Sequence, residues 1–568
     1  MSQAEDVKFS LKVVINKQKS KVLFAEADSD FTDVLLSFLT LPLGTIVRTL
    51  EKHYGDKAPV IGSLTTLYNG LSNLDNALFW AKCSKQMLMN PRSSSETECP
   101  KLKLNIFDET QPIKYFKCEN KDCEYNKNIP TVSMYFGGLE CDCGYLLSKE
   151  IGLRDKKTKR AVNDDSGGGG VFTINKAYFI ISDDLQILPS LTGSIIRILS
   201  NLSITDTDGT ELRNVTFGFN EIMDLLKGSL LSQTPLTDLI LKRQLGTVTA
   251  KYDFEKEATS NTCTKMTLKA ILQKSTNKLL FVEAKDDFID FLFSLLAIPL
   301  GEVERLFGSS TSLKNIDNLY RSVADINGDM YLKTDDTKTM LLQPKLPFGY
   351  ISEKHILPLN EEEAPDLYLC EGLLSEDEIS NNPGERVSRV EFRKCMGYYV
   401  EGQRMYMVTD DLTVTPLVSC LSIFSGMNIR FSDVKELEMH IGLEEAMSIL
   451  KASLTSTSAI TDGLINPTLR NNQNKNSEGD EMDSCSIAGR YCPSVSIESP
   501  KGPGNYVKGP TMYMVTDGLT VTPLCTTSSL YFLNRLKIPF SDVKEMELEI
   551  GLEEALSILK ASLMSTWA

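Results

Sequence analysis

Four cysteines in the first third of the chain have the residue type and spacing of metal ligands. Cys118 and Cys123 lie in KCENKDCEYN, and Cys141 and Cys143 lie in ECDCGYLL. Four thiolates arranged as two pairs can close a tetrahedral Zn²⁺ site of the zinc-ribbon type. The spacings within the pairs, C-x₄-C and C-x-C, differ from the C-x₂-C knuckles of common zinc ribbons. Two interpretations therefore stay open: a structural zinc site, or a cluster of small buried thiols in a loop.

A metal at these four cysteines would be structural, because four protein ligands leave no coordination position for a substrate water. The second half of the chain supports this limit. Cys370 is the counterpart of Cys118 there, and Cys395 lies further on, but no paired thiols remain. A unit that is repeated without its four cysteines cannot depend on a metal for chemistry that both copies share.

Two glutamates are the next candidates for chemistry. Glu26 and Glu283 occupy matching positions, where a predicted strand gives way to a predicted helix. Carboxylates at the start of a helix stabilise it through capping and the helix dipole, by about 0.3–1 kcal/mol each, and this is the simpler explanation. The alternative is a small-molecule site in a cleft around Glu26.

Adjacent aspartates occur at Asp183-Asp184 and again at Asp410-Asp411. Neighbouring side chains on a strand point to opposite faces, and at a turn they point to solvent. Neither arrangement brings two carboxyl groups together for acid–base catalysis. The third copy of this stretch carries Asp517-Gly518, a strong signal for a two-residue type I′ turn. We therefore predict the same exposed turn at all three positions.

Other common catalytic motifs find little support in the sequence. Gly167 to Gly170 lacks the Lys-Ser/Thr that follows the glycines of a P-loop, so a flexible connector is the better interpretation. The three histidines, His53, His355 and His440, do not recur at matching positions. The sequence therefore offers too few histidines in matching positions to favour a hydrolase triad or a histidine-rich metal site.

The elements that would position these residues come from a duplicated unit. Leu11 to Gly44 recurs at Leu268 to Gly301 without a gap, at a constant offset of 257 residues. In both copies the apolar pattern predicts a β-hairpin followed by a helix. An Asp or Ser at 28–30 can cap the first of these helices, and the Pro-Leu-Gly sequence at 42–44 should end it and start a second helix.

The later part of the unit occurs three times. YFIISDDLQILP begins at Tyr178, MYMVTDDLTVTP at Met405 and MYMVTDGLTVTP at Met512. Each copy closes with a short strand and an amphipathic helix that should pack on the sheet. The predicted fold class is therefore α+β, with tandem duplicated modules of antiparallel hairpins and meanders packed by helices, plus a C-terminal half-module.

Shifts in composition mark the domain boundaries. We divide the chain into these segments: a first full module at 1–245, with a zinc-ribbon-like insert at about 115–147; a linker at 246–264; a second full module at 265–464 without the cysteine cluster; a polar linker at 465–503, which we expect to be disordered; and a third, partial module at 504–568. The near identity of the last segment with the second module has two explanations, a recent duplication or a mis-joined gene model.

The chain is acidic, and its charge is unevenly placed. Its 568 residues have a formal net charge of −16, and residues 251–568 hold 31 Lys+Arg against 46 Asp+Glu. An acidic half repels phosphate backbones, which makes nucleic acid an unlikely partner. The best basic run, Arg154 to Arg160, is either a solvated loop or a minimal nuclear-import pattern.

The sequence predicts no export signal and no membrane span. The N-terminus has no basic start followed by an apolar run, and the longest apolar run, at 34–47, is shorter than the roughly 20 residues that a membrane span needs. We expect a soluble protein of the cytoplasm, or of the nucleus, whose thirteen cysteines stay reduced.

Three phrases together carry a family resemblance: LFAEADSDFTDVLLSFLTLPLG in the hairpin-helix unit, a four-cysteine segment that ends in CDCG, and YMVTDDLTVTP followed by LKASL. With these the chain resembles the domain-of-unknown-function 674 family, over nearly its whole length outside the linkers. The resemblance implies a plant origin and an uncharacterised function. It supplies no catalytic residues to carry over.

The chain repeats its structural unit without repeating a set of catalytic residues, and its second half is acidic. Both features favour a non-enzymatic protein-interaction or scaffold protein. The third, partial module should expose surface that a first half normally covers, so we expect a protein partner or self-association there. Two alternatives remain. One is a small-molecule-binding protein or enzyme with a cleft between subdomains, and the other is a zinc-ribbon nucleic-acid binder that uses the basic run.

Overall fold

The structure, a computed structural model, describes residues 7–469 with internal gaps, together with 513–515 and 521–523. The gaps are 94, 97, 107–112, 121–122, 124–129, 137–138, 155–169, 176, 202–208, 244–265, 352–354, 371, 377–386, 395–398, 401, 403, 418–428 and 430. The linker at 246–264 and most of the polar linker and the third module therefore lie outside the described residues. So do Cys395, the Asp517-Gly518 turn, and all of the basic run except Arg154.

The first sheet has five antiparallel strands in the order β7-β6-β2-β1-β8. Its strands are β1 (Phe9–Asn16), β2 (Lys21–Asp28), β6 (Tyr178–Ser182), β7 (Ile187–Pro189) and β8 (Thr210–Phe217). Burial alternates along the start of β1, where Phe9, Leu11 and Val13 are buried and the residues between them are not. The predicted hairpin is confirmed, and the later meander adds its strands to both edges of that hairpin.

The second sheet has the same order, β16-β15-β10-β9-β17, and is also antiparallel. Its strands are β9 (Met266–Gln273), β10 (Leu279–Lys285), β15 (Met405–Val408), β16 (Val414–Pro416) and β17 (Val434–Ile441). Helices together with antiparallel sheets make an α+β fold, as predicted.

The helix after the first hairpin follows the expected pattern. Asp28 is its N-cap, and the Asp28 carboxylate accepts a 3.0 Å hydrogen bond from the Phe31 backbone N–H. The first-half helices are α1 (Ser29–Ser37), η1 (Phe38–Thr40), α2 (Leu43–Tyr54), η2 (Gly55–Lys57), α3 (Leu64–Asn73), η3 (Asn76–Leu78), α4 (Lys82–Met89), η4 (Cys99–Lys101), α6 (Thr192–Asn201), α7 (Phe219–Leu231) and α8 (Pro235–Ile240). The break between η1 and α2 falls at Pro42, as the Pro-Leu-Gly sequence predicts.

The described helices of the second half follow a similar order. They are α9 (Asp286–Ser294), η5 (Leu295–Ala297), α10 (Leu300–Leu306), α11 (Lys314–Asp325), α12 (Gly328–Tyr331), α13 (Asp335–Leu342), η6 (Phe431–Asp433), α15 (Leu443–Thr455) and η7 (Thr461–Ile465). Among the described helices of either half, none is long and apolar enough to cross a membrane.

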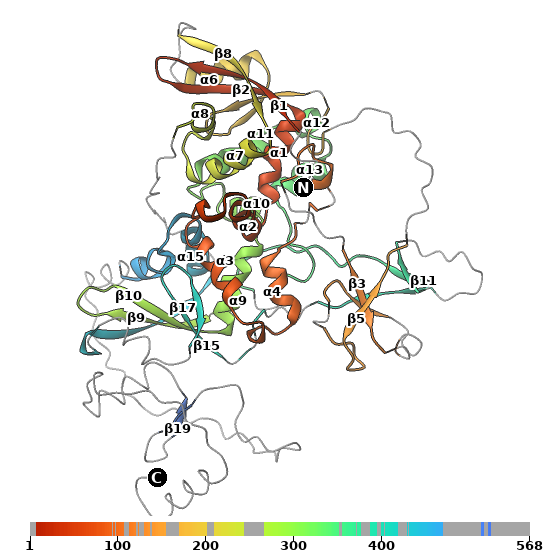
Figure 1. Ribbon diagram of the computed structural model, residues 1–568, viewed down its shortest axis with the longest axis vertical. Helices are drawn as coiled ribbons and strands as arrows, with labels where there is room; N and C mark the ends of the chain where they lie inside the picture. The colour runs from red at the N-terminus through yellow and green to blue at the C-terminus, as the bar shows by residue number, and fades with distance from the viewer. Residues whose placement is uncertain are drawn as a thin grey trace, which may run out of the picture.

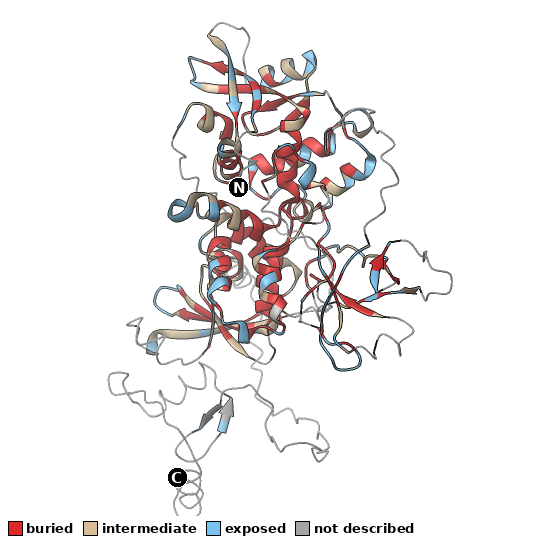
Figure 2. Ribbon diagram, turned by 45° about the vertical axis from the view of Figure 1, so that its right-hand side comes forward, coloured by how far each residue is buried: buried red, intermediate tan, exposed pale blue. Residues whose placement is uncertain are grey.

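The two halves exchange helices. Figure 1 shows α11 and α12 of the second half beside the first sheet, and α3 of the first half beside the second sheet. The contacts are reciprocal: Asn318 Nδ2 donates a 3.0 Å hydrogen bond to the Asp184 carbonyl oxygen, and Thr66 Oγ1 donates to the Asp411 carbonyl oxygen. One apolar core runs through both halves, and buried residues fill the helices between the sheets (Figure 2).

The Pro-Leu-Gly sequences of the two copies meet at the centre of this core. A backbone bridge joins Pro42 to Pro299. A Cβ atom on Gly44 would lie 3.0 Å from the Leu296 carbonyl oxygen, and one on Gly301 would lie 3.0 Å from the Leu39 carbonyl oxygen. Glycine at both positions therefore lets the backbones of the two copies approach this closely.

A small lobe stands beside the helices, and we call it the cysteine lobe (Figure 1). It is a sheet of order β14-β4-β3-β5. Its strands are β3 (Tyr115–Cys118), β4 (Thr131–Ser133), β5 (Leu147–Ile151) and, from the second half of the chain, β14 (Glu391–Phe392). A second small sheet packs against it through buried apolar side chains, with strands β11 (Tyr368–Cys370), β12 (Leu373–Ser375) and β13 (Ser388–Arg389). Both halves of the chain thus build this lobe.

The third copy is described only as a hairpin. β18 (Tyr513–Val515) pairs antiparallel with β19 (Val521–Pro523), in the register of β15 with β16.

Candidate metal centre

The structure brings together the sulfur atoms of the four candidate cysteines. All four Sγ atoms lie within 4.8 Å of one another. Cys118 Sγ lies 3.4 Å from Cys143 Sγ, and Cys123 Sγ lies 3.5 Å from Cys141 Sγ. Sulfurs bound to one tetrahedral Zn²⁺ at about 2.3 Å would lie about 3.8 Å apart. The cluster therefore has the dimensions to hold a metal ion.

Local turns aim each pair of sulfurs at the other pair. The Gly144 N–H donates a 2.8 Å hydrogen bond to the Cys141 carbonyl, and the Cys141 N–H donates one of 2.8 Å to the Tyr145 carbonyl. Gly144 has φ of +82°, a conformation that L side chains rarely adopt, so the CDCG sequence needs its glycine. On the other side of the cluster the Cys123 N–H bonds to the Asn120 carbonyl at 3.2 Å.

The surroundings of the cluster favour neutral thiols unless a cation is present. Burial raises the pKa of Cys118 to about 11, and the neighbouring Cys143 thiol adds to this rise. Burial also raises the pKa of Cys123 to about 12, again with help from the neighbouring thiols. A bound divalent cation would reverse this preference because it stabilises thiolate ligands directly.

The described residues of the second half support the lobe and place no sulfur in the cluster. Cys370, the counterpart of Cys118, is 1 % exposed in β11 and lies 3.9 Å from Arg154 Nη1. Leu369 beside it packs with Tyr115 and Val132 of the cysteine lobe. Where the first half has its cluster, the second half has an apolar packing surface.

The candidate glutamates do not sit at a helix start. Glu26 lies within β2, and Asp28 caps the helix instead. The Glu26 carboxylate lies 3.6 Å from Lys12 Nζ and accepts a 3.3 Å hydrogen bond from Ser190 Oγ. Glu283 lies within β10 and is 1 % exposed. Of the three possible caps at residues 28–30, Asp28 is therefore the one that caps the helix.

Two buried aspartates that follow these glutamates have structural roles. Asp33 accepts hydrogen bonds from Thr173 N at 2.9 Å and Thr173 Oγ1 at 2.8 Å, and burial raises the Asp33 pKa to about 6. Asp290 accepts from the N–H groups of Tyr399 and Val400, both at 2.9 Å, and burial raises its pKa to about 8. Each carboxylate ties a distant backbone segment to the first helix of its half.

The first aspartate pair lies at a turn, as predicted, but the prediction that both carboxylates face solvent is wrong. Asp183 is 5 % exposed. It accepts hydrogen bonds from the N–H and Oγ1 of Thr237, both at 2.8 Å, and so anchors the start of α8. Burial raises the Asp183 pKa to about 6. Asp410 holds Thr461 in the same way in the second half, at 2.7 and 2.8 Å.

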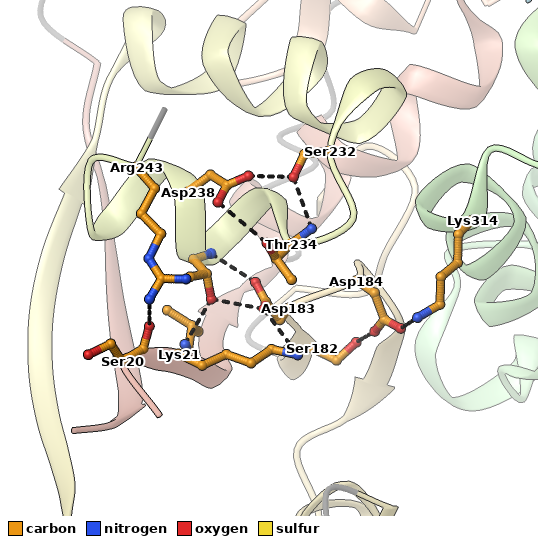
Figure 3. A network of polar contacts seen from close by, with 12 residues as sticks. Ser20, Lys21, Ser182, Asp183, Asp184, Ser232, Thr234, Asp238, Arg243 and Lys314 are labelled. Atoms are coloured by element: carbon orange, nitrogen blue, oxygen red, sulfur yellow. Dashed lines mark hydrogen bonds and ion pairs between the residues drawn. The ribbon is translucent and has the colours of Figure 1, made fainter. Parts of the chain in front are cut away.

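The geometry of this turn also differs from type I′. The residue with positive φ is Leu185 (61°) in the first half and Leu412 (64°) in the second, one position after each aspartate pair. Asp184 accepts hydrogen bonds from Ser182 Oγ at 2.7 Å and pairs with Lys314 Nζ at 2.9 Å (Figure 3). Asp183 and Asp184 thus connect the end of β6 to α8 of the same half and to α11 of the second half.

A cavity of about 460 Å³ lies between the cysteine lobe and the first-half helices, and none of its described lining residues was a candidate in the sequence. Its described lining comes from α2 and α4, from the segment at 90–105, and from the aromatic residues Phe116, Tyr135, Phe136 and Tyr350. Glu26 and Glu283 do not line it.

Comparison with curated proteins and with solved structures finds no match. The family model described as "Protein of unknown function (DUF674)" matches residues 5–442, and further matches cover 369–489 and 490–553. These matches span most of the chain, including both sheets and the cysteine lobe. The chain therefore belongs to the DUF674 family of proteins of unknown function.

Proposed function

We propose that this chain is a non-enzymatic protein-interaction or scaffold protein in which Cys118, Cys123, Cys141 and Cys143 hold one structural Zn²⁺. The observation that carries this proposal is the convergence of four sulfurs within 4.8 Å. Four thiolates suit Zn²⁺ and leave no position for a substrate, so the metal would serve the fold.

The position of the cluster supports a structural role. It links the end of β3 to the turn before β5, in a lobe whose strands are two to five residues long. Such a small sheet has little core of its own, and a metal is a common means of stabilising it. Cys118 and Cys143 are partly accessible to solvent, which would let the ion enter.

Two observations support an interaction role. Three buried carboxylates, those of Asp33, Asp183 and Asp290, accept hydrogen bonds from backbone N–H groups and so have structural roles. In addition, β18 pairs only with β19 among the described residues, whereas its counterpart β15 also pairs with β10. An unpaired strand edge can take a strand from a partner protein or from a second copy of this chain.

Metal analysis of the full chain tests the zinc proposal. Purified protein should contain about one zinc per chain. Cys141→Ser should lose it, and Cys370→Ser, a buried cysteine outside the cluster, should keep it. Absence of zinc from the unmodified chain, with all four thiols reacting freely with a thiol reagent, would refute the metal site.

Light scattering after size-exclusion chromatography, together with an unbiased pull-down, tests the interaction role. The full chain and a shortened chain ending at Leu464 should differ in oligomeric state or in captured partners. If the two behave alike, the third module has no part in association.

A further inference from the structure

We propose that the cavity of about 460 Å³ beside the cysteine lobe binds a small organic carboxylate with an aromatic body, and that Arg48 binds the carboxylate group. This inference goes beyond the proposed interaction protein, because it assigns a ligand class to a site that the metal does not occupy.

The size and position of the cavity suit a small ligand. Its volume falls within the range of roughly 300–1,000 Å³ that is typical of ligand pockets. One wall comes from α2 and α4, and the facing wall comes from the cysteine lobe through Phe116 and Tyr135. Pockets between two packed units are a common place for ligands.

The cavity is cationic in an otherwise acidic chain. Its described lining contains Arg48, Arg92 and Lys114 but only one carboxylate, Glu96, whereas the whole chain has a net charge of −16. Two of the cations already have acidic partners. Arg92 Nη2 lies 2.5 Å from the Glu96 carboxylate, and Lys114 Nζ lies 3.1 Å from the Glu150 carboxylate.

Arg48 is the cation without such a partner. Its Nη1 donates to the Asn90 side-chain oxygen, and its buried Nε atom has no hydrogen-bond partner. No acidic side chain among the described residues forms an ion pair with Arg48. A buried Nε–H without an acceptor is costly, and a carboxylate is the group that fits the fork of N–H donors on a guanidinium.

The second copy of the sequence shows which side chain of the protein itself can pair with the arginine at this position. Arg305 matches Arg48 at the offset of 257 residues, and Glu302 matches Thr45. Arg305 Nε donates to Glu302 at 2.8 Å, and Arg305 Nη2 donates at 2.6 Å, so the carboxylate takes both. Thr45 instead donates its hydroxyl to the Pro91 carbonyl at 3.0 Å. The first copy has Thr45 in place of Glu302, and a ligand would supply the carboxylate there.

The rest of the cavity selects an aromatic body for that ligand. Phe116 and Phe136 lie edge to face with ring centroids 5.3 Å apart, and Tyr350 and Met87 also line the cavity. Phe136 is 61 % exposed and so presents an accessible aromatic ring at the cavity. Aromatic walls with one charged anchor recognise an aromatic acid better than a bare anion.

Isothermal titration calorimetry on the full chain, as purified, tests this inference. The probes are benzoate, trans-cinnamate and 1-naphthoate, each compared with its neutral carboxamide. We expect at least one carboxylate to bind, and its carboxamide to bind at least about tenfold more weakly, because the amide cannot form the charged pair with Arg48. No binding by any of the carboxylates at 5 mM, or equal binding by acid and amide, would overturn the proposal.

Two variants locate the site. Thr45→Glu reproduces the internal carboxylate of the second copy and should weaken binding at least about tenfold by competing for Arg48. Arg48→Met should do the same by removing the anchor, and it covers the case in which Thr45→Glu does not fold. Thr339→Glu is the control for Thr45→Glu, and Arg213→Met is the control for Arg48→Met. Both controls change the charge at exposed positions outside the cavity, so both chains should bind the carboxylate like the unmodified chain. Unchanged binding by a folded Arg48→Met chain would overturn the assignment.

Discussion

Pro42 and Pro299 face each other across the centre of the molecule, in an antiparallel bridge between the two halves of the chain. The flanking hydrogen bonds are reciprocal: the Leu43 N–H donates to the Ile298 carbonyl and the Leu300 N–H donates to the Leu41 carbonyl, both at 2.9 Å. This is the arrangement of an isologous dimer interface, formed here within one chain. The exchange of helices around it makes the two sheets parts of one folded body.

The close contact at this bridge predicts that Gly301→Ala destabilises the protein. A Cβ atom at Gly301 would lie 2.8 Å from the Leu341 carbonyl oxygen and 3.0 Å from that of Leu39, and rigid backbone cannot give way cheaply. We expect a loss of about 1–3 kcal/mol in the free energy of unfolding, measured with a chemical denaturant.

Gly70→Ala is the matched control for this change. Gly70 lies inside α3, and its nearest potential contact is 3.6 Å away, so an alanine has room there. Helix propensity alone would then stabilise the variant by up to about 1 kcal/mol. If Gly301→Ala is as stable as Gly70→Ala, the close approach at the bridge is wrong.

Asp290 predicts a loss of stability as pH rises. Burial raises its pKa in the folded chain to about 8, far above the usual value of 3.8, so folding favours the protonated acid. Its stabilising contribution is complete below about pH 4 and is lost as pH rises to about 8, with a slope of up to about 1.4 kcal/mol per pH unit. Asp290→Asn should keep an oxygen acceptor for the N–H groups of Tyr399 and Val400 while removing this slope.

Denaturant unfolding at pH 5 and pH 8 measures that difference. Asp33 and Asp183, with pKa values raised by burial to about 6, add slopes of their own, so the informative quantity is the unmodified chain minus Asp290→Asn. Equal pH dependence of the two proteins would show that Asp290 is ionised in the fold.

The sequence predicts local features well because neighbouring residues determine them. The hairpin, a helix cap within residues 28–30 and the break at Pro42 all depend on contacts within a few positions. Apolar periodicity shows that α3 and α11 are amphipathic, but it does not show which sheet each helix covers. For the same reason the turn at Asp183 was predictable and its burial was not, since its partner Thr237 is 54 residues away.

The same difference between local and long-range information applies to the candidate sites. The four cysteines could be predicted to form one site because cysteine is a common metal ligand and because their spacing is paired. Arg48 carried no such signal, because an arginine on a helix is ordinary. It becomes informative only when the cavity is seen and when Thr45 is compared with Glu302 of the second copy.

The Asp183 anchor predicts a clear loss of stability in Asp183→Ala. The substitution removes the acceptor for Thr237 N and Thr237 Oγ1 and leaves a buried donor unpaired, which should cost about 1–3 kcal/mol in thermal or denaturant unfolding. Glu211→Ala removes only the surface pairs with Lys17 and Arg213 and should change stability by less than about 1 kcal/mol. Similar losses in the two variants would mean that the anchor contributes no more than a surface ion pair.

The exchange of helices predicts that Asn315→Ala weakens both sheets together. Asn315 belongs to the second half, and its buried side-chain amide donates to the carbonyls of Ser229 at 3.1 Å and Ser232 at 2.6 Å, at the end of first-half helix α7. Losing these bonds should cost about 1–3 kcal/mol. Because each sheet is covered by helices from the other half, neither half should unfold alone. Hydrogen exchange measured by mass spectrometry should therefore show the same loss of protection in β1 and β9. A loss confined to β1 would show that the halves are separate folding units despite their shared core.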